Sequence, residues 1–88
     1  MKIVCVKWGD AWVDGSKDFT ETEAQTFEPI TRTTVGYYIV ENENCLVLAT
    51  DYYDDDKSYN CPMIIPRAWI YSIASIEIAN IEDENTTH

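Results

Sequence analysis

Histidine is almost missing from this sequence of 88 residues, and its single copy, His88, is the last residue. An imidazole at a chain end is not oriented toward a nucleophile or a metal ion, so Ser-His and Cys-His catalytic pairs are excluded. Sixteen acidic side chains would allow a carboxylate pair, but none lies in an apolar setting that would raise its pKa. We therefore expect a protein that is not an enzyme and binds no cofactor.

Basic side chains are also few. Six Lys and Arg stand against sixteen Asp and Glu, which gives a net charge of −10. Nonspecific binding to a nucleic-acid backbone needs clustered cations that release counterions, so the charge disfavours RNA as a partner. An acidic excess more often serves solubility than recognition of a basic partner.

The cysteines lack the spacing of a disulfide scaffold or a zinc site. Cys5, Cys45 and Cys61 are odd in number and form no C-x-x-C pair. Cys5 and Cys45 lie in apolar runs, where a free thiol packs as a small hydrophobe. No apolar run is long enough for a signal peptide or a membrane span. We therefore expect a cytoplasmic protein with no membrane contact.

The polar segment 54–60 has oxygen-bearing side chains at alternate positions, beginning with Asp54 and Asp56, as a calcium loop does. The glycine and the glutamate that an EF-hand requires would fall at Tyr59 and Ile65. We therefore expect a solvated loop and no metal site.

Short segments rich in β-branched and aromatic residues, bounded by turn residues, are typical of strands. They cover residues 2–8, 30–41, 45–53, 62–65 and 70–79. Their regular spacing, with no long helical pattern between them, predicts an all-β fold, a small five-stranded barrel over residues 1–80. The polar residues 81–88 are expected to form a flexible acidic tail. Between the second and third strands, the segment 42–44 predicts a tight turn, because Asn tolerates positive φ.

Residues 19–28 are compatible with a short helical turn or with an irregular loop. Thr20 and Glu23 have the spacing of a capping box, and Pro29 ends either structure.

The segment 63–73, MIIPRAWIYSI, interrupts an apolar strand with a proline. Because Pro66 cannot donate a hydrogen bond to a sheet, the strand should stop there. Residues 67–69 then have room for one 3₁₀ turn before the last strand. We expect Trp69 to be buried at this corner, closing one end of the barrel.

This order of elements is similar to the small barrels of the SH3-like and Sm-like families, and Ile65-Pro66 followed by Trp69 resembles the SH3 corner. The chain also resembles small proteins of tailed phages. The motifs that carry this second resemblance are Trp8-x-Asp10-Ala11, Thr34 to Tyr37, Leu48-Ala49, the acidic loop and Ile65-Pro66-Arg67.

The resemblance implies a small β-barrel encoded by a phage and located in the host cytoplasm. It implies no activity, and the binding residues of neither barrel family carry over. Residues 4–8 lack the Ala-Leu-Tyr-x-Tyr signature of SH3 domains, and residues 66–68 lack the glycine of the Sm corner.

Two strands are apolar on both faces, around Val35–Val40 and around Cys45–Ala49. A sheet with one solvated face should alternate apolar and polar residues. The outer face should therefore be covered, either by the segment 15–29 or by a neighbouring subunit. We predict a homo-oligomer, a ring in preference to a dimer, joined at the edge of strand 45–53 or 62–65.

Aromatic residues among acids, together with two arginines, are typical of interaction surfaces. The candidate interaction residues are Trp12, Arg32, Tyr38, Tyr52, Tyr53, Asp54, Asp55, Asp56 and Arg67. The leading hypothesis is a non-catalytic, self-assembling binding module. The alternatives are an acidic nucleic-acid mimic that inhibits a host defence or DNA-processing protein, and an Sm-like ring that binds RNA through its arginines and stacking tyrosines.

Overall fold

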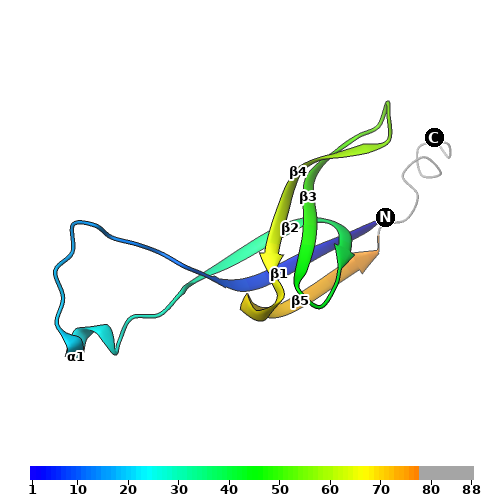
Figure 1. The fold of residues 1–88 in the computed structure, drawn as a ribbon. Coiled ribbons are helices and arrows are strands. Elements are labelled where there is room, and N and C mark those ends of the chain that lie inside the picture. The colour runs from blue at the N-terminus through cyan, green and yellow to red at the C-terminus, as the bar shows by residue number, and fades with distance from the viewer. Residues whose placement is uncertain (78–88) are drawn as a thin grey trace.

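The computed structural model describes residues 1–77, which form one sheet of five antiparallel strands (Figure 1). The strands are β1 Lys2–Asp10, β2 Ile30–Glu41, β3 Cys45–Tyr53, β4 Ser58–Pro66 and β5 Ile70–Glu77. Their order in the sheet is β4-β3-β2-β1-β5. The all-β prediction is confirmed. The sheet is open, with β4 and β5 at its edges, so the structure does not show the predicted barrel.

The predicted strand boundaries differ from the structure mainly at β4. This strand begins at Ser58, whereas the sequence predicted a loop through residue 60. The turn is shorter than expected because Lys57 adopts a positive φ of 55° and Asp56 accepts hydrogen bonds from Ser58. Residues 78–79 of the predicted last strand and the predicted tail 81–88 lie outside the described residues.

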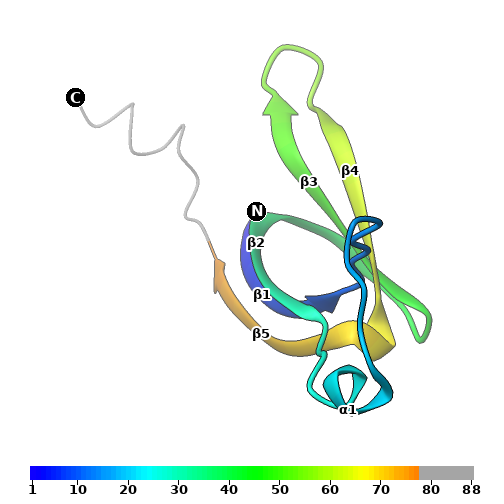
Figure 2. The same ribbon diagram turned by 90° about the vertical axis from the view of Figure 1, so that its left-hand side faces the viewer.

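The core lies on one face of the sheet, where alternate side chains of β1, β3 and β4 meet. Its fully buried members are Val4, Val6, Trp8, Leu46, Leu48 and Ile65. β2 crosses β3 closely at Gly36, where a Cβ would lie 2.8 Å from the carbonyl oxygen of Ala49. A register shift between Tyr38 and Val40 follows on the same strand. Both features curve the sheet, and Figure 2 shows β1, β2 and β5 following one arc beside the β3–β4 hairpin.

The predicted 3₁₀ turn is confirmed as η1, Arg67–Trp69, between β4 and β5. The backbone N–H of Arg67 donates to the carbonyl oxygen of Asn44 at 2.9 Å, and its guanidinium pairs with Glu41. These contacts hold the corner against the turn that joins β2 to β3. The short turn predicted at residues 42–44 is confirmed, but neither asparagine adopts the expected positive φ; instead Asn42 Oδ1 accepts from the backbone N–H of Asn44 at 2.8 Å.

The predicted burial of Trp69 is wrong, because this side chain remains 43% exposed. Its ring lies flat against Trp8, with centroids 6.5 Å apart and an interplanar angle of 10°. Trp8 takes the buried position instead, at 6% exposure, and its indole N–H donates to Thr34 Oγ1 at 2.9 Å. Trp8 lies on β1, which has a strand on each side, whereas Trp69 lies at the corner of an open sheet with no strand over it.

Residues 11–29, here called the arm, leave the end of β1 and return to the start of β2 (Figure 1). The arm contains α1, Glu21–Ala24, whose first turn is capped by Thr20 as the capping-box spacing predicted. The molecule measures 63 × 26 × 23 Å, with a radius of gyration of 18.0 Å. A compact chain of this length would have about 12 Å. The arm projects away from the sheet, so the expectation that residues 15–29 cover its outer face is wrong.

Candidate interaction surfaces

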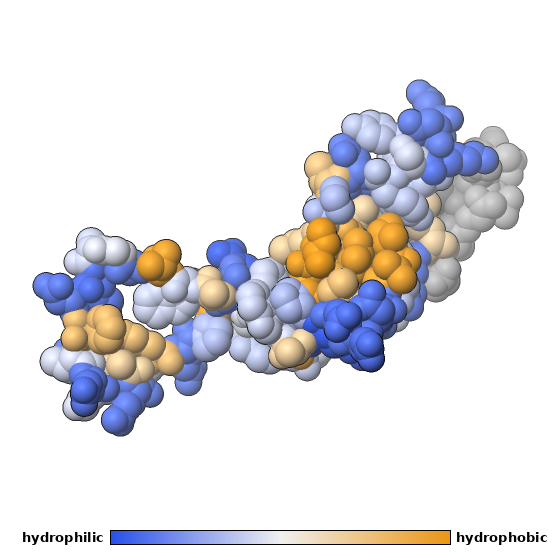
Figure 3. Space-filling view, viewed as in Figure 1, coloured by the Kyte–Doolittle hydropathy of each residue, from blue (hydrophilic) through white to orange (hydrophobic). Residues whose placement is uncertain are grey.

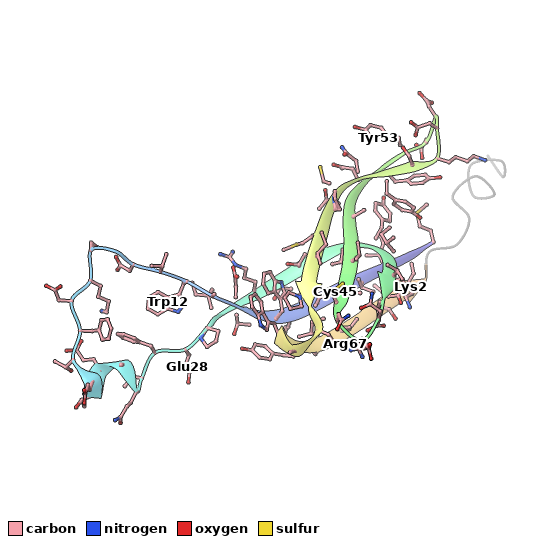
Figure 4. All side chains as sticks on the ribbon, in the orientation of Figure 1. Lys2, Trp12, Glu28, Cys45, Tyr53 and Arg67 are labelled. Atoms are coloured by element: carbon pink, nitrogen blue, oxygen red, sulfur yellow. The ribbon has the colours of Figure 1, made fainter. Side chains whose placement is uncertain are left out.

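The arm carries an aromatic cluster of its own. Phe27 packs edge-on against Trp12, with ring centroids 5.6 Å apart, and against Phe19 at 5.5 Å. The indole N–H of Trp12 donates to the carbonyl oxygen of Glu28 at 2.6 Å, which ties the outgoing segment to the returning one (Figure 4). The Lys17 ammonium lies 5.5 Å from the centre of the Phe27 ring. These contacts give the arm a defined shape without a core beneath it.

A hollow of about 440 Å³ lies between the two segments of the arm, lined mainly by its aromatic residues and Pro29. Much of this apolar surface faces solvent, since Val13 is 92% exposed and Phe19 61%. The contacts within the arm leave these apolar side chains largely exposed, and such surfaces are typical of contacts with a partner.

The tip of the arm contains a turn stabilised by Asp14. Its carboxylate accepts hydrogen bonds from the Ser16 hydroxyl at 2.7 Å and from the Ser16 backbone N–H at 3.1 Å. The hydroxyl bond, and next the backbone bond, favour the charged form and lower the pKa of Asp14. At the base of the arm, Arg32 pairs with Asp10 at 2.5 Å.

A second surface lies on the face of the sheet opposite the core. Val40, Val47 and Ile64 are cross-strand neighbours on β2, β3 and β4 and form what we call the apolar row. Val47 lies between two buried leucines, so it points to the other face. Ile64 is 58% exposed and Val40 48%. Figure 3 shows a continuous apolar area over β3 and β4.

A third surface is the outer half of the β3–β4 hairpin. Tyr37, Tyr52 and Tyr59 form a cluster there, with ring centroids 5.0 to 6.3 Å apart. Tyr53, near the tip in Figure 4, accepts a hydrogen bond from Asn60. The turn beyond holds three aspartates at positions 54 to 56. One of them is committed to the turn through its bonds to Ser58, and all three are exposed.

The candidate interaction residues from the sequence do not form one site. Trp12 lies in the arm, and Arg32 lies beside its base. The tyrosine and aspartate candidates 52–56 lie on the hairpin, and Arg67 lies at the corner. Tyr38 packs against the core, with the Lys2 ammonium 4.1 Å from its ring centre.

Sequence reasoning missed the partners that make the arm a structured surface, Phe19 and Phe27, and it missed Ile64. Phe19 directly precedes the capping box of Thr20 and Glu23, and Phe27 follows it by four residues. Both phenylalanines therefore lie close to a helix signal that is visible in the sequence. Ile64 belongs to the second apolar face of the sheet, but only the register of β3 and β4 places it beside Val47.

Among residues 1–77, no group of His, Cys, Asp or Glu side chains is arranged to hold a metal ion. Within the same residues, no helix has the length and apolar character of a membrane-spanning segment. Comparison with protein-family models, curated proteins and solved structures finds no match for this chain.

Proposed function

We propose that the protein is a non-catalytic binding module that assembles with copies of itself. The observation that carries the proposal is the direction of the arm. The apolar residues on the outer face of the sheet imply that this face is covered. Either the arm of the same chain or a neighbouring subunit could cover it. The arm projects away from the sheet, so residues 1–77 leave Val40 and Ile64 of the apolar row exposed.

A second copy fits the row because each chain carries both an apolar arm and an apolar sheet face. The arm of one copy lies on the apolar row of the next, and a rotation that closes gives a ring.

The fold we propose for each copy is the Sm-like or SH3-like small barrel of the tailed-phage proteins that the sequence resembles. The strand order, the long segment after β1 and the 3₁₀ corner before β5 support it. In this proposal the barrel stays open between β4 and β5, which remain its two edge strands.

RNA binding by such a ring has less support. Arg32 pairs with Asp10, and Arg67 pairs with Glu41, so both arginines are partly neutralised. The stacking tyrosines lie beside three exposed aspartates, which would repel phosphate. The same aspartates are the feature that favours the acidic-mimic alternative, and capture of a host DNA-processing protein would support it.

Light scattering tests the proposal, since self-association depends on protein concentration. We expect the wild-type protein to be an oligomer and Ile64→Glu to dissociate it, because a charge in the row is left buried and unpaired. Val35→Glu is the matched control, since Val35 is 59% exposed on the outer face of β2 but pairs with β1 and lies outside the row. A monomeric wild-type protein at high concentration would contradict the proposal.

A further inference from the structure

The two edges of the sheet differ in their ability to pair with another strand. β3 lies between β2 and β4, so the prediction that strand 45–53 supplies a free edge is wrong. Among the described residues, only β4 and β5 have an unpaired side. Exposed edges invite pairing unless prolines, charges or bulges block it.

The β4 edge is blocked by its prolines. In an antiparallel ladder, alternate residues direct their N–H and C=O groups to the same side. The N–H of Asn42 donates to Cys45 across the β2–β3 turn, so the odd-numbered residues of β3 face β2 and the even-numbered residues face β4. Since Leu46 pairs with Ile65, the even-numbered residues of β4 face outward. Residues 62 and 66 are proline and have no N–H group. Of the three outward-facing residues 62, 64 and 66, only Ile64 therefore has an N–H that could bond to another strand.

The same alternation in the direction of the backbone N–H and C=O groups can be followed across the sheet to β5. Tyr37 faces Ala49 on β3, so Gly36 faces Val4 on β1. The even-numbered residues of β1 therefore face β2, and its odd-numbered residues face β5. Cys5 pairs with Ala74, so the even-numbered residues of β5 are bonded to β1.

The backbone groups of Ile73 and Ser75 consequently point away from the sheet, in the part of β5 where the register with β1 is regular. No proline and no charged side chain lies between Ile70 and Ile76. The aliphatic side chains on this edge are exposed, Ile73 at 39% and Ile76 at 69%. Beyond the register shift near Trp8, this edge is uncharged and free of proline, so neither of these protections against pairing is present from Ser72 to Ile76.

We propose that the β5 edge is a strand-pairing surface and that its occupant is β5 of a second copy, antiparallel about a two-fold axis at Ile73. This inference rests on the proposed self-assembly and deepens it by placing one contact. The sequence of β5 is complementary to itself in this register. Ile73 meets Ile73 of the mate, and Ser72 meets Ala74.

This register also satisfies the direction of the backbone groups. A two-fold axis at Ile73 pairs odd-numbered residues with odd-numbered residues, so the outward-facing N–H and C=O groups of Ile73 bond to those of the mate. Although the chain has a net charge of −10, no like charges face each other between residues 70 and 76. The result is one continuous sheet through both copies.

The two-fold contact and the arm contact use different surfaces, so they predict different assemblies. Copies joined through the arm and the apolar row form a ring, and β5 pairing joins each copy of one ring to a copy of another. The number of chains should therefore be even. Removing the β5 contact should halve the mass, and removing the row contact should leave dimers paired through β5.

Hydrogen exchange of the unmodified chain provides the first test. The amides of residues 72, 74 and 76 are bonded to β1 and should exchange slowly in any state. The amides of Ile73 and Ser75 should be protected only in the oligomer, and dilution should expose them. Rapid exchange of these two amides in the oligomer, or protection that persists in the monomer, would overturn the proposal.

Light scattering of two variants provides the second test. Ile73→Pro removes an outward-facing donor without breaking the ladder to β1, and we expect it to halve the mass with circular dichroism unchanged. Ile76→Lys, which puts a charge on the exposed part of this edge, should do the same, whereas Val35→Lys should keep the wild-type mass. If Ile73→Pro fails to fold, the lysine pair and the exchange data decide the question. A wild-type mass in folded Ile73→Pro and Ile76→Lys would refute β5 pairing and leave the arm contact standing, whereas a monomeric wild-type protein would refute both.

Discussion

The stacked tryptophans Trp8 and Trp69 provide a direct test of whether the sheet is open at its corner. Trp8 is 6% exposed and Trp69 43%, although their rings lie in contact. If the sheet closed into a barrel over the corner, both rings would be buried. Truncation of each to alanine therefore measures how open the corner is.

The expected losses follow from burial. Replacing a buried Trp by alanine costs about 3–5 kcal/mol, and Trp8→Ala also leaves the Thr34 hydroxyl without its indole donor, which adds about 1 kcal/mol. For Trp69, complete burial of a large apolar side chain contributes about 1.5–3 kcal/mol, and little more than half of this ring is covered. With about 0.5–1.5 kcal/mol for the stacked contact, Trp69→Ala should cost about 2 kcal/mol.

Urea unfolding at one fixed protein concentration measures these losses, since self-association would otherwise contribute to the apparent stability. Trp8→Phe provides a milder variant if Trp8→Ala does not fold. The double variant should lose less than the sum of the single losses by about 0.5–1.5 kcal/mol, because both single changes remove the same stacked contact. Equal losses for Trp69→Ala and Trp8→Ala would refute the open corner and indicate a closed barrel with Trp69 inside it.

Two further outcomes are expected. Gly36→Ala should destabilise the protein by about 1–3 kcal/mol in the same urea assay, because its Cβ would lie 2.8 Å from a carbonyl oxygen and a strand must move; an unchanged midpoint would contradict the close crossing of β2 and β3. Ser16→Ala should raise the pKa of Asp14 toward its ordinary value in a carboxyl NMR titration, because both the hydroxyl and the favourable turn geometry are affected. Since the pKa of Asp14 is lowered in the folded state, the turn is intact above the ordinary pKa of an aspartate and weakens as the pH falls through the pKa of the folded state. A pKa of Asp14 that is unchanged by the substitution would contradict the hydroxyl bond.

The strands and the corner could be predicted because their signals are local. β-Branched alternation marked β1, β2 and β3, and the Asn-rich turn fixed the hairpin between the last two. Pro66 marked the end of β4, and the spacing of Thr20 and Glu23 marked α1. Each of these features depends on backbone chemistry within a few residues of the signal.

The direction of the arm and the opening of the sheet could not be predicted, because they depend on contacts that the local pattern leaves undetermined. Residues 15–29 contain two phenylalanines that could have packed on the sheet. In the structure, Phe19 and Phe27 instead satisfy each other within the arm. The burial of Trp69 failed for a related reason, because a tryptophan after a proline corner predicts a ring near the core but not a strand over it.

The prolines of β4 show how a local sequence signal and the strand register combine. In the sequence, Pro62 is the first residue of the predicted strand 62–65 and Pro66 marks its end, whereas in the structure both prolines lie within β4. Only the register shows that they share one side of an edge strand, with Ile64 between them. An edge with one donor among three outward positions pairs poorly, whereas the β5 edge keeps the donors of Ile73 and Ser75. The asymmetry favours assembly through β5 over aggregation through both edges, and it follows from the two prolines of β4.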